Sequence, residues 1–137
     1  MTNAPTSAAQ FSAVGLAAAD LAKTLAFYRR LGLDIPADAD TAGHVDIALP
    51  GGLRLMVDSD AEIRKFRPDW TPVSGAGRIS LAFALPDSAA VDALHAELIG
   101  AGYRSEMDPF DAFWGQRYAT VLDPDGNGVD LFAPLAS

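Results

Sequence analysis

The chain has 137 residues, which is enough for one domain with one sizeable hydrophobic core. It carries 18 Asp and Glu against 10 Lys and Arg, and this formal charge of -8 disfavours nucleic acid as a partner, because nucleic acid requires a basic surface. Cysteine is absent, which excludes disulfides, thiolate metal sites and cysteine nucleophiles. No apolar run reaches the roughly 20 residues of a membrane span, and residues 1–16 hold no Lys or Arg, so we expect a cytoplasmic protein without a membrane partner.

The first part of the chain predicts a strand, a helix and then further strands. Apolar and polar residues alternate where strands are expected, whereas the helix repeats its apolar residues every three or four positions. The expected elements are a strand over residues 13–18, a helix that begins after Asp20 and ends before Gly32, and strands over residues 45–49 and 53–57 that the turn Pro50-Gly51-Gly52 joins.

The same order of elements returns in the second part of the chain. Asp87, which can cap the second helix, follows the first helix-capping residue, Asp20, by 67 residues. The expected elements are a strand over residues 81–85, a helix from Asp87 to Gly100, and strands over residues 118–122 and 128–132. We infer an α+β fold built from an internal repeat of a βαβββ unit.

The predicted domain covers residues 11–134 as one unit. Module one is expected at about residues 11–59, a connector at 60–77 and module two at 78–134. In each module the helix packs on one face of the sheet, and the alternate residues of each strand line the opposite face. Candidate functional residues are therefore sought on that second face.

Two groups of residues resemble the vicinal-oxygen-chelate superfamily, which contains glyoxalases, bleomycin-resistance proteins and dioxygenases. Residues 18–33 resemble the opening strand and helix of that family, and residues 114–118 with 123–127, WGQRY and DPDGN, resemble its closing hairpin. The resemblance covers about residues 11–134. It implies two βαβββ modules whose mixed sheet curls into a cup, usually at a homodimer interface.

The resemblance also implies where a metal would bind. Metal-dependent members of the family carry one ligand on each of four strands, and these positions fall here on Ala13, Met56, Ser80 and Asp130. Only Asp130 is a good ligand, whereas a catalytic metal usually needs three or more ligands from the protein. We therefore expect neither a metal nor another cofactor.

Within the family, the chain is most similar to the mitomycin-resistance, drug-binding members. Residues 51–55, 121–127 and 129–135 carry this similarity. It implies that Trp114 stacks on a planar ligand and that His44 covers the opposite face of that ligand. The other residues expected to contact the ligand are Met56, Arg54, Tyr118, Asp46 and Phe113.

Aromatic side chains are concentrated just before the last two predicted strands. Phe110, Phe113 and Trp114 are expected in a loop at the rim of the cup, where flat rings can stack on a planar ligand. The alternative role for such rings is packing in the core or at the dimer interface, and this role is favoured for Phe110.

Two classes of function follow from these residues. No spacing in the chain marks a catalytic dyad or triad, and we predict no catalytic residue. The favoured function is a metal-independent binding protein that sequesters a planar aromatic or quinone-like antibiotic or natural product and so confers self-resistance. The alternative is a lyase or dioxygenase-related enzyme of the same superfamily that acts on a small metabolite. The expected partners are a planar small molecule and a second copy of the chain in a homodimer.

Overall fold

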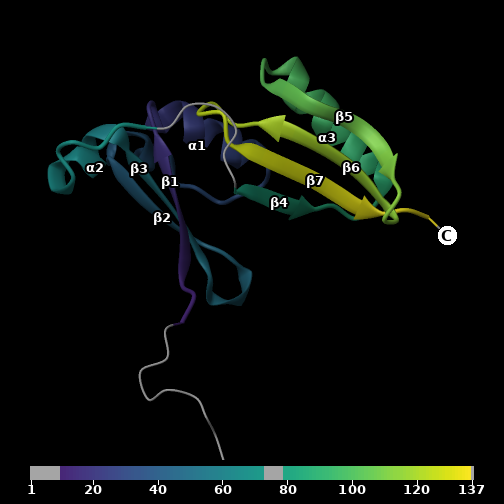
Figure 1. Cartoon of the computed structure of the whole chain (residues 1–137), viewed down its shortest axis with the longest axis horizontal. Coiled ribbons are helices and arrows are strands. Elements are labelled where there is room, and N and C mark those ends of the chain that lie inside the picture. Colours follow the sequence, from purple (N-terminus) through teal and green to yellow (C-terminus); the bar gives the residue numbers. More distant parts are fainter. Residues whose placement is uncertain (1–9, 73–78, 137) are drawn as a thin grey trace, which may run out of the picture.

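The computed structural model describes residues 10–72 and 79–136 of the chain, so residues 73–77 of the predicted connector lie outside the described part. In chain order the elements are β1 (Ala13–Ala18), α1 (Leu21–Arg30), the 3-10 helix η1 (Ala37–Thr41), β2 (His44–Ala48), η2 (Pro50–Gly52), β3 (Arg54–Ser59), α2 (Asp60–Phe66), β4 (Ser80–Ala84), α3 (Ser88–Gly100), β5 (Arg104–Ala112), β6 (Gln116–Leu122) and β7 (Gly128–Pro134). The strands form a three-stranded sheet in the order β1-β3-β2 and a four-stranded sheet in the order β4-β7-β6-β5. Figure 1 shows the two sheets beside each other, with α1 between them and α3 behind the second sheet.

The internal repeat is present at the level of backbone pairing and helix capping. In each sheet the first strand pairs in parallel with the last, since β1 pairs with β3 and β4 with β7. Each long helix begins at an aspartate whose carboxylate accepts a backbone N–H, Asp20 from Lys23 and Asp87 from Ala90. Each ends before a glycine with a φ of 101°, Gly32 or Gly102, a conformation that favours glycine. These findings confirm the predicted α+β class and its two-module order.

Module one differs from the predicted βαβββ unit by one strand. Module two has the full order β4-α3-β5-β6-β7, but the described part of module one has three strands. The 3-10 helix η1 stands between α1 and β2, where module two has its edge strand β5. The sequence there is Pro36 followed by alternating small and acidic residues, which disfavour a strand and offer no apolar face.

The strand β5 also corrects the expected position of one aromatic residue. Phe110 was expected in a loop, but it lies within β5, opposite Tyr118 of β6. The strand escapes the sequence pattern because it contains Pro109 and because two irregularities interrupt its pairing with β6. An edge strand tolerates both features, since only one of its sides pairs with a neighbour.

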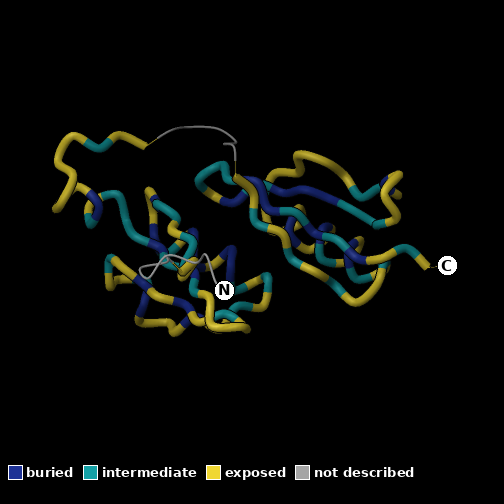
Figure 2. The backbone as a smooth tube through the Cα atoms, turned by 60° about the horizontal axis from the view of Figure 1, so that its bottom comes forward, coloured by how far each residue is buried: buried dark blue, intermediate teal, exposed yellow. Residues whose placement is uncertain are grey.

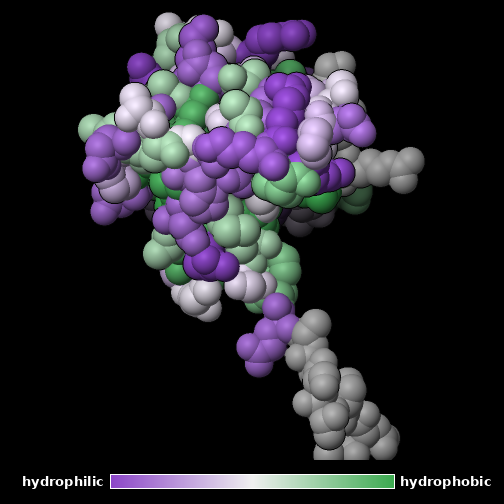
Figure 3. All heavy atoms as spheres, turned by 90° about the vertical axis from the view of Figure 1, so that its left-hand side faces the viewer, coloured by the Kyte–Doolittle hydropathy of each residue, from purple (hydrophilic) through white to green (hydrophobic). Residues whose placement is uncertain are grey.

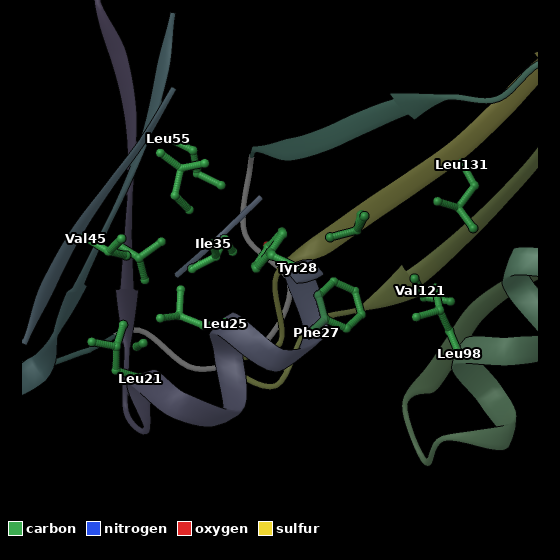
Figure 4. Packing of buried hydrophobic residues seen from close by; sticks show 14 of the residues in the cluster. Leu21, Leu25, Phe27, Tyr28, Ile35, Val45, Leu55, Leu98, Val121 and Leu131 are labelled. Carbon is green, nitrogen blue, oxygen red and sulfur yellow. The ribbon is translucent and has the colours of Figure 1, made fainter. Parts of the chain in front are cut away.

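The core lies on the helix-facing sides of the two sheets and reaches from one module to the other. In Figure 4, Leu21 and Leu25 of α1 point toward the first sheet, and Phe27 points away from it. The ring of Phe27 packs edge-on against Tyr103, which follows α3, with ring centroids 4.8 Å apart. Leu98 of α3 is fully buried in the same cluster. The helix α1 therefore covers one face of the first sheet, and α3 covers one face of the second sheet. Figure 2 shows exposed and partly exposed residues alternating with buried ones along the strands.

The DPDGN turn between β6 and β7 joins the two modules. Asp123 is buried, and its carboxylate accepts a hydrogen bond of 2.7 Å from the hydroxyl of Tyr28 in α1. Asp125 accepts one hydrogen bond from the backbone N–H of Ala19 and another from the hydroxyl of Thr24. Burial and the adjacent Asp123 raise the pKa of Tyr28 well above its ordinary value, which keeps the phenol protonated as a donor. The motif therefore has a structural role in this chain.

No helix in the described part of the chain is long and apolar enough to cross a membrane.

Candidate ligand site

The open face of the second sheet, the face away from α3, carries an aromatic cluster, which we define as Phe110, Phe113, Trp114 and Tyr118. Trp114 contacts each of the other three rings edge-on, with centroids 6.1 Å from Phe110, 5.0 Å from Phe113 and 5.2 Å from Tyr118. The indole N–H of Trp114 donates to Gln116, which fixes the ring plane. Trp114 is 49% exposed and Phe113 is 96% exposed, so the cluster presents ring surface to solvent.

Beside the aromatic cluster, Asp130 of β7 is held by three hydroxyl groups. Its carboxylate accepts hydrogen bonds from Tyr118 at 2.6 Å, Thr120 at 2.7 Å and Ser80 at 3.2 Å. Partial burial and the hydrogen bond to Asp130 raise the pKa of Tyr118 to about 12, so its phenol stays protonated and donates at neutral pH. The three hydroxyls thus hold the carboxylate in a fixed orientation, and Asp130 is only partly exposed.

The open face of the first sheet, the face away from α1, carries charged side chains instead of rings. His44 of β2 lies opposite Asp58 of β3, and their side chains meet at 2.5 Å. Arg54 forms an ion pair with Asp46 on the neighbouring strand. Met56 lies between these two pairs. Figure 3 views the molecule from the side of the first sheet, and hydrophilic side chains cover much of that end.

The four positions that hold metal in other family members do not form a metal site here. Ala13 and Met56 on the first sheet offer no ligand for a divalent ion, and Ser80 is a hydroxyl that donates to Asp130. Among residues 10–72 and 79–136, no group of three His, Cys, Asp or Glu side chains is placed to hold a metal. The residues present therefore do not fit the family's metal.

The seven residues predicted to contact a ligand fall into two groups. Three belong to the second sheet and its β5–β6 turn: Phe113, Trp114 and Tyr118. Four share the open face of the first sheet: His44, Asp46, Arg54 and Met56. The β5–β6 turn, which carries Trp114, lies at the end of the second sheet that is farthest from the first sheet (Figure 1). Within one chain, the predicted stacking partners Trp114 and His44 thus belong to separate surfaces.

Several polar partners at these surfaces escaped the sequence analysis. Asp58 completes a pair with His44, although no dyad was predicted. Ser80 and Thr120 hold Asp130, which the sequence singles out only as a metal-ligand position. Counting outward from the turn at residues 50–52 would have placed His44 opposite Asp58, because a tight hairpin fixes its own register.

A second histidine is part of a structural network. His95 of α3 is buried, and its ring nitrogen lies 2.8 Å from the hydroxyl of Ser105. That hydroxyl donates its proton to Asp108 at 2.6 Å, so it accepts from His95 and is not activated by it. This arrangement gives His95 a structural role.

The second tryptophan lies at another place in the molecule. Trp70 lines a hollow of about 370 Å³ together with Asp60, with Gly15 of β1 and with Asp125 of the DPDGN turn. The guanidinium of Arg64 lies 5.8 Å from the centre of its ring. Trp70 is therefore separate from the aromatic cluster and is the second tryptophan against which changes at Trp114 can be compared.

Comparison with known proteins agrees with the fold described above. The model of the Glyoxalase/Bleomycin resistance protein/Dioxygenase superfamily matches residues 10–131. A glyoxalase/bleomycin resistance protein/dioxygenase family enzyme from Burkholderia phytofirmans has a similar structure, with a TM-score of 0.75 and 20% identity over 93% of this chain and 100% of that one. A glyoxalase-related enzyme from Fulvimarina pelagi has a TM-score of 0.75 and 19% identity, over 90% of this chain and 87% of that one.

A lactoylglutathione lyase from Agrobacterium tumefaciens is also similar, with a TM-score of 0.61 and 24% identity over 95% of each chain. At these identities the structural likeness establishes the fold. No curated protein matches the chain at a significant level. Because the family model covers nearly the whole sequence, the chain belongs to the glyoxalase/bleomycin resistance protein/dioxygenase superfamily.

Proposed function

We propose that this protein binds a planar aromatic or quinone-like molecule, such as an antibiotic or another natural product, and sequesters it without converting it. The observation that carries the proposal is the aromatic cluster, whose largest ring, Trp114 of the β5–β6 turn, is half exposed and packs against Tyr118 of the second sheet. Clustered and exposed rings of this kind are costly in water and are typical of a surface that binds an apolar partner. The resemblance of residues 51–55, 121–127 and 129–135 to mitomycin-resistance, drug-binding members, which is inferred from the sequence alone, is a further argument for this function.

The site is proposed to be completed in a homodimer. Trp114 and His44 belong to surfaces on different sheets of one chain, so a ligand held between them requires the first sheet of a second copy. Such an interface should bury more than roughly 1,000 Å² in total. Analytical ultracentrifugation at tens of micromolar should therefore show a dimer, and a monomer at that concentration would refute this arrangement.

The proposed function is tested by titration of tryptophan fluorescence with planar aromatic antibiotics. The chain has two tryptophans, so the Trp70→Phe variant reports on Trp114 alone. We expect quenching that saturates, with unchanged affinity relative to the wild type. Trp114→Ala should weaken binding by about ten- to a hundredfold, because removal of a stacking ring costs roughly 1–3 kcal/mol. Equal binding by Trp114→Ala and wild type would refute the proposal.

Metal independence is tested on the purified protein. Elemental analysis should find no stoichiometric Zn, Ni, Fe or Mn, because only one of the four family positions, Asp130, carries a good ligand. About one transition metal per chain, lost in Asp130→Ala, would contradict this expectation.

One observation favours a second candidate, a lyase or dioxygenase-related enzyme that acts on a small metabolite. The carboxylate of Asp58 lies 2.5 Å from a ring nitrogen of His44, and such a pair can orient an imidazole as a general base. The discriminating measurement is chromatography of the bound compound after prolonged incubation with the protein. Recovery of the unchanged compound supports sequestration, whereas steady conversion that is lost in His44→Phe supports the enzyme.

A further inference from the structure

Asp130 differs from the other acidic residues of the open sheet faces, because it has no cationic partner. On the first sheet, Asp58 lies against His44 and Asp46 against Arg54. Among the described residues, no Lys, Arg or His forms an ion pair with Asp130. A partly buried carboxylate is stabilised by hydroxyl donors, but its charge is not neutralised by them.

The three hydroxyls also leave the carboxylate with capacity for another donor. One oxygen of Asp130, Oδ2, accepts from both Tyr118 and Ser80. The other oxygen, Oδ1, accepts from Thr120 only. A carboxylate offers about four acceptor positions in total, so Oδ1 can take one more hydrogen bond from an incoming group.

Tyr118 connects this carboxylate to the aromatic cluster. Its ring packs edge-on against Trp114 at 5.2 Å, and its hydroxyl donates to Asp130 at 2.6 Å. The stacking surface and the carboxylate are therefore separated by one tyrosine side chain. A fused-ring molecule stacked on Trp114 would have to extend past this one side chain for a nitrogen at its far end to meet Asp130.

We propose that the ligand of this site is a flat ring system that carries a positively charged, hydrogen-bond-donating nitrogen, and that Asp130 selects it. This inference rests on the proposed function, since it names the chemistry of the molecule that the aromatic cluster binds. The formal charge of -8 favours the approach of a cation to any face of the protein, and Asp130, which has no ion pair in the described part of the chain, is one tyrosine side chain away from the rings. Charge-assisted hydrogen bonds are also stronger than neutral ones, which gives the discrimination.

The test compares two planar tricyclic probes of similar shape at pH 8. 9-Aminoacridine is protonated at this pH, and acridone is neutral. Dye fluorescence anisotropy with the wild type should show binding of both, with 9-aminoacridine preferred by about tenfold or more, as expected for a hydrogen bond to a charged group. Asp130→Asn should bind the two probes about equally, because the preference for 9-aminoacridine depends on the charge of the carboxylate.

The matched control is Asp38→Asn, which removes the same charge from an exposed residue of η1 and should keep the wild-type preference. If Asp130→Asn also keeps the preference, the inference is wrong while the proposed function stands. Equal affinity of the wild type for both probes overturns the inference without any variant, so a poorly folded Asp130→Asn protein leaves the test intact. If Trp114→Ala binds acridone as well as the wild type does, the proposed function itself fails.

Discussion

The two sheets pair three of their strands in the same way, β1-β3-β2 and β4-β7-β6, but their open faces carry different kinds of side chain. Met56 and Asp130 occupy matching places, since Met56 lies opposite Gly15 on β1 and Asp130 lies opposite Ala82 on β4. Their neighbours on the antiparallel side also match in position, but Met56 faces Asp46, whereas Asp130 faces Thr120. The first face is a set of paired charges, and the second is an aromatic cluster next to a lone carboxylate.

The comparison shows that the fold constrains the helix-facing residues of both sheets, whereas the residues of the open faces can vary with function. The helix-facing residues and the two helix caps are constrained in both modules, because they close the core and satisfy the ends of the helices. The open faces make no contribution to that core, so their side chains are free to differ between modules. The residues that determine the ligand are therefore expected on the open faces, and the second face holds the ring surface.

The largest expected effect is on stability and concerns the contact between the DPDGN turn and α1, which holds the two modules together. Asp123 is 4% exposed and accepts hydrogen bonds from Tyr28, from two backbone N–H groups and from the side chain of Asn127. Asp123→Ala leaves the Tyr28 hydroxyl buried without its partner and should lower the free energy of unfolding by about 3–5 kcal/mol. Urea denaturation measures this loss.

The control for that variant is Asp38→Ala, which changes an exposed residue and should alter stability by less than about 0.5 kcal/mol. A loss below about 1 kcal/mol in Asp123→Ala would show that the hydrogen bonds of Asp123 contribute little to holding the two modules together.

The sequence predicts the ends of the two long helices, but it does not predict the contact between the DPDGN turn and α1. Helix starts at Asp20 and Asp87 and stops at Gly32 and Gly102 follow from local rules, because caps and left-handed turns need particular residues. The DPDGN segment was recognised as a family motif, but its contacts with α1 are long-range and leave no local signal.

The candidate site shows the same limit. The register of the β2–β3 hairpin follows from its short turn, so the pair of His44 and Asp58 was within reach of sequence reasoning. Ser80 reaches Asp130 through parallel pairing of β4 with β7, and no turn connects those strands to reveal the register. The edge strand β5 was missed because its proline and its irregular pairing break the alternating pattern.

The second prediction tests whether the first face contributes ring surface or proton chemistry to the ligand. His44→Phe should keep the affinity for a planar aromatic compound within about threefold, whereas His44→Ala should lose about tenfold, on the scale of ring stacking. The affinity of the wild type should also change little between pH 6 and 8. A strong pH dependence together with loss of function in His44→Phe would assign His44 to acid–base chemistry.

The third prediction concerns the second face and depends on the raised pKa of Tyr118. Between its ordinary value of about 10 and the folded value of about 12, the unfolded chain loses the phenol proton and the folded chain keeps it. The stabilisation from Tyr118 is therefore complete below pH 10 and is lost as the pH rises toward 12.

The wild type should accordingly exceed Tyr118→Phe in stability by about 1 kcal/mol at pH 8, near the lower end for a hydrogen bond to a charged group because the site is partly exposed. That difference should shrink above pH 10, as measured by urea unfolding across the pH range. A difference that stays constant to pH 12 would mean that the phenol of Tyr118 is not held by Asp130.

The smallest expected effect is the ion pair of Asp46 and Arg54 on the first face. Their side chains are 36% and 41% exposed, so water screens the attraction and two flexible side chains lose freedom when they pair. A double-mutant cycle with Asp46→Asn and Arg54→Gln should give a coupling free energy below about 1 kcal/mol, and the coupling should nearly vanish in 1 M salt, where the screening length is about 3 Å. A coupling free energy of this size is expected for an ion pair that is exposed to water within a single chain. A coupling well above it would mean that the second copy of the chain shields the pair from water when it completes the proposed ligand site.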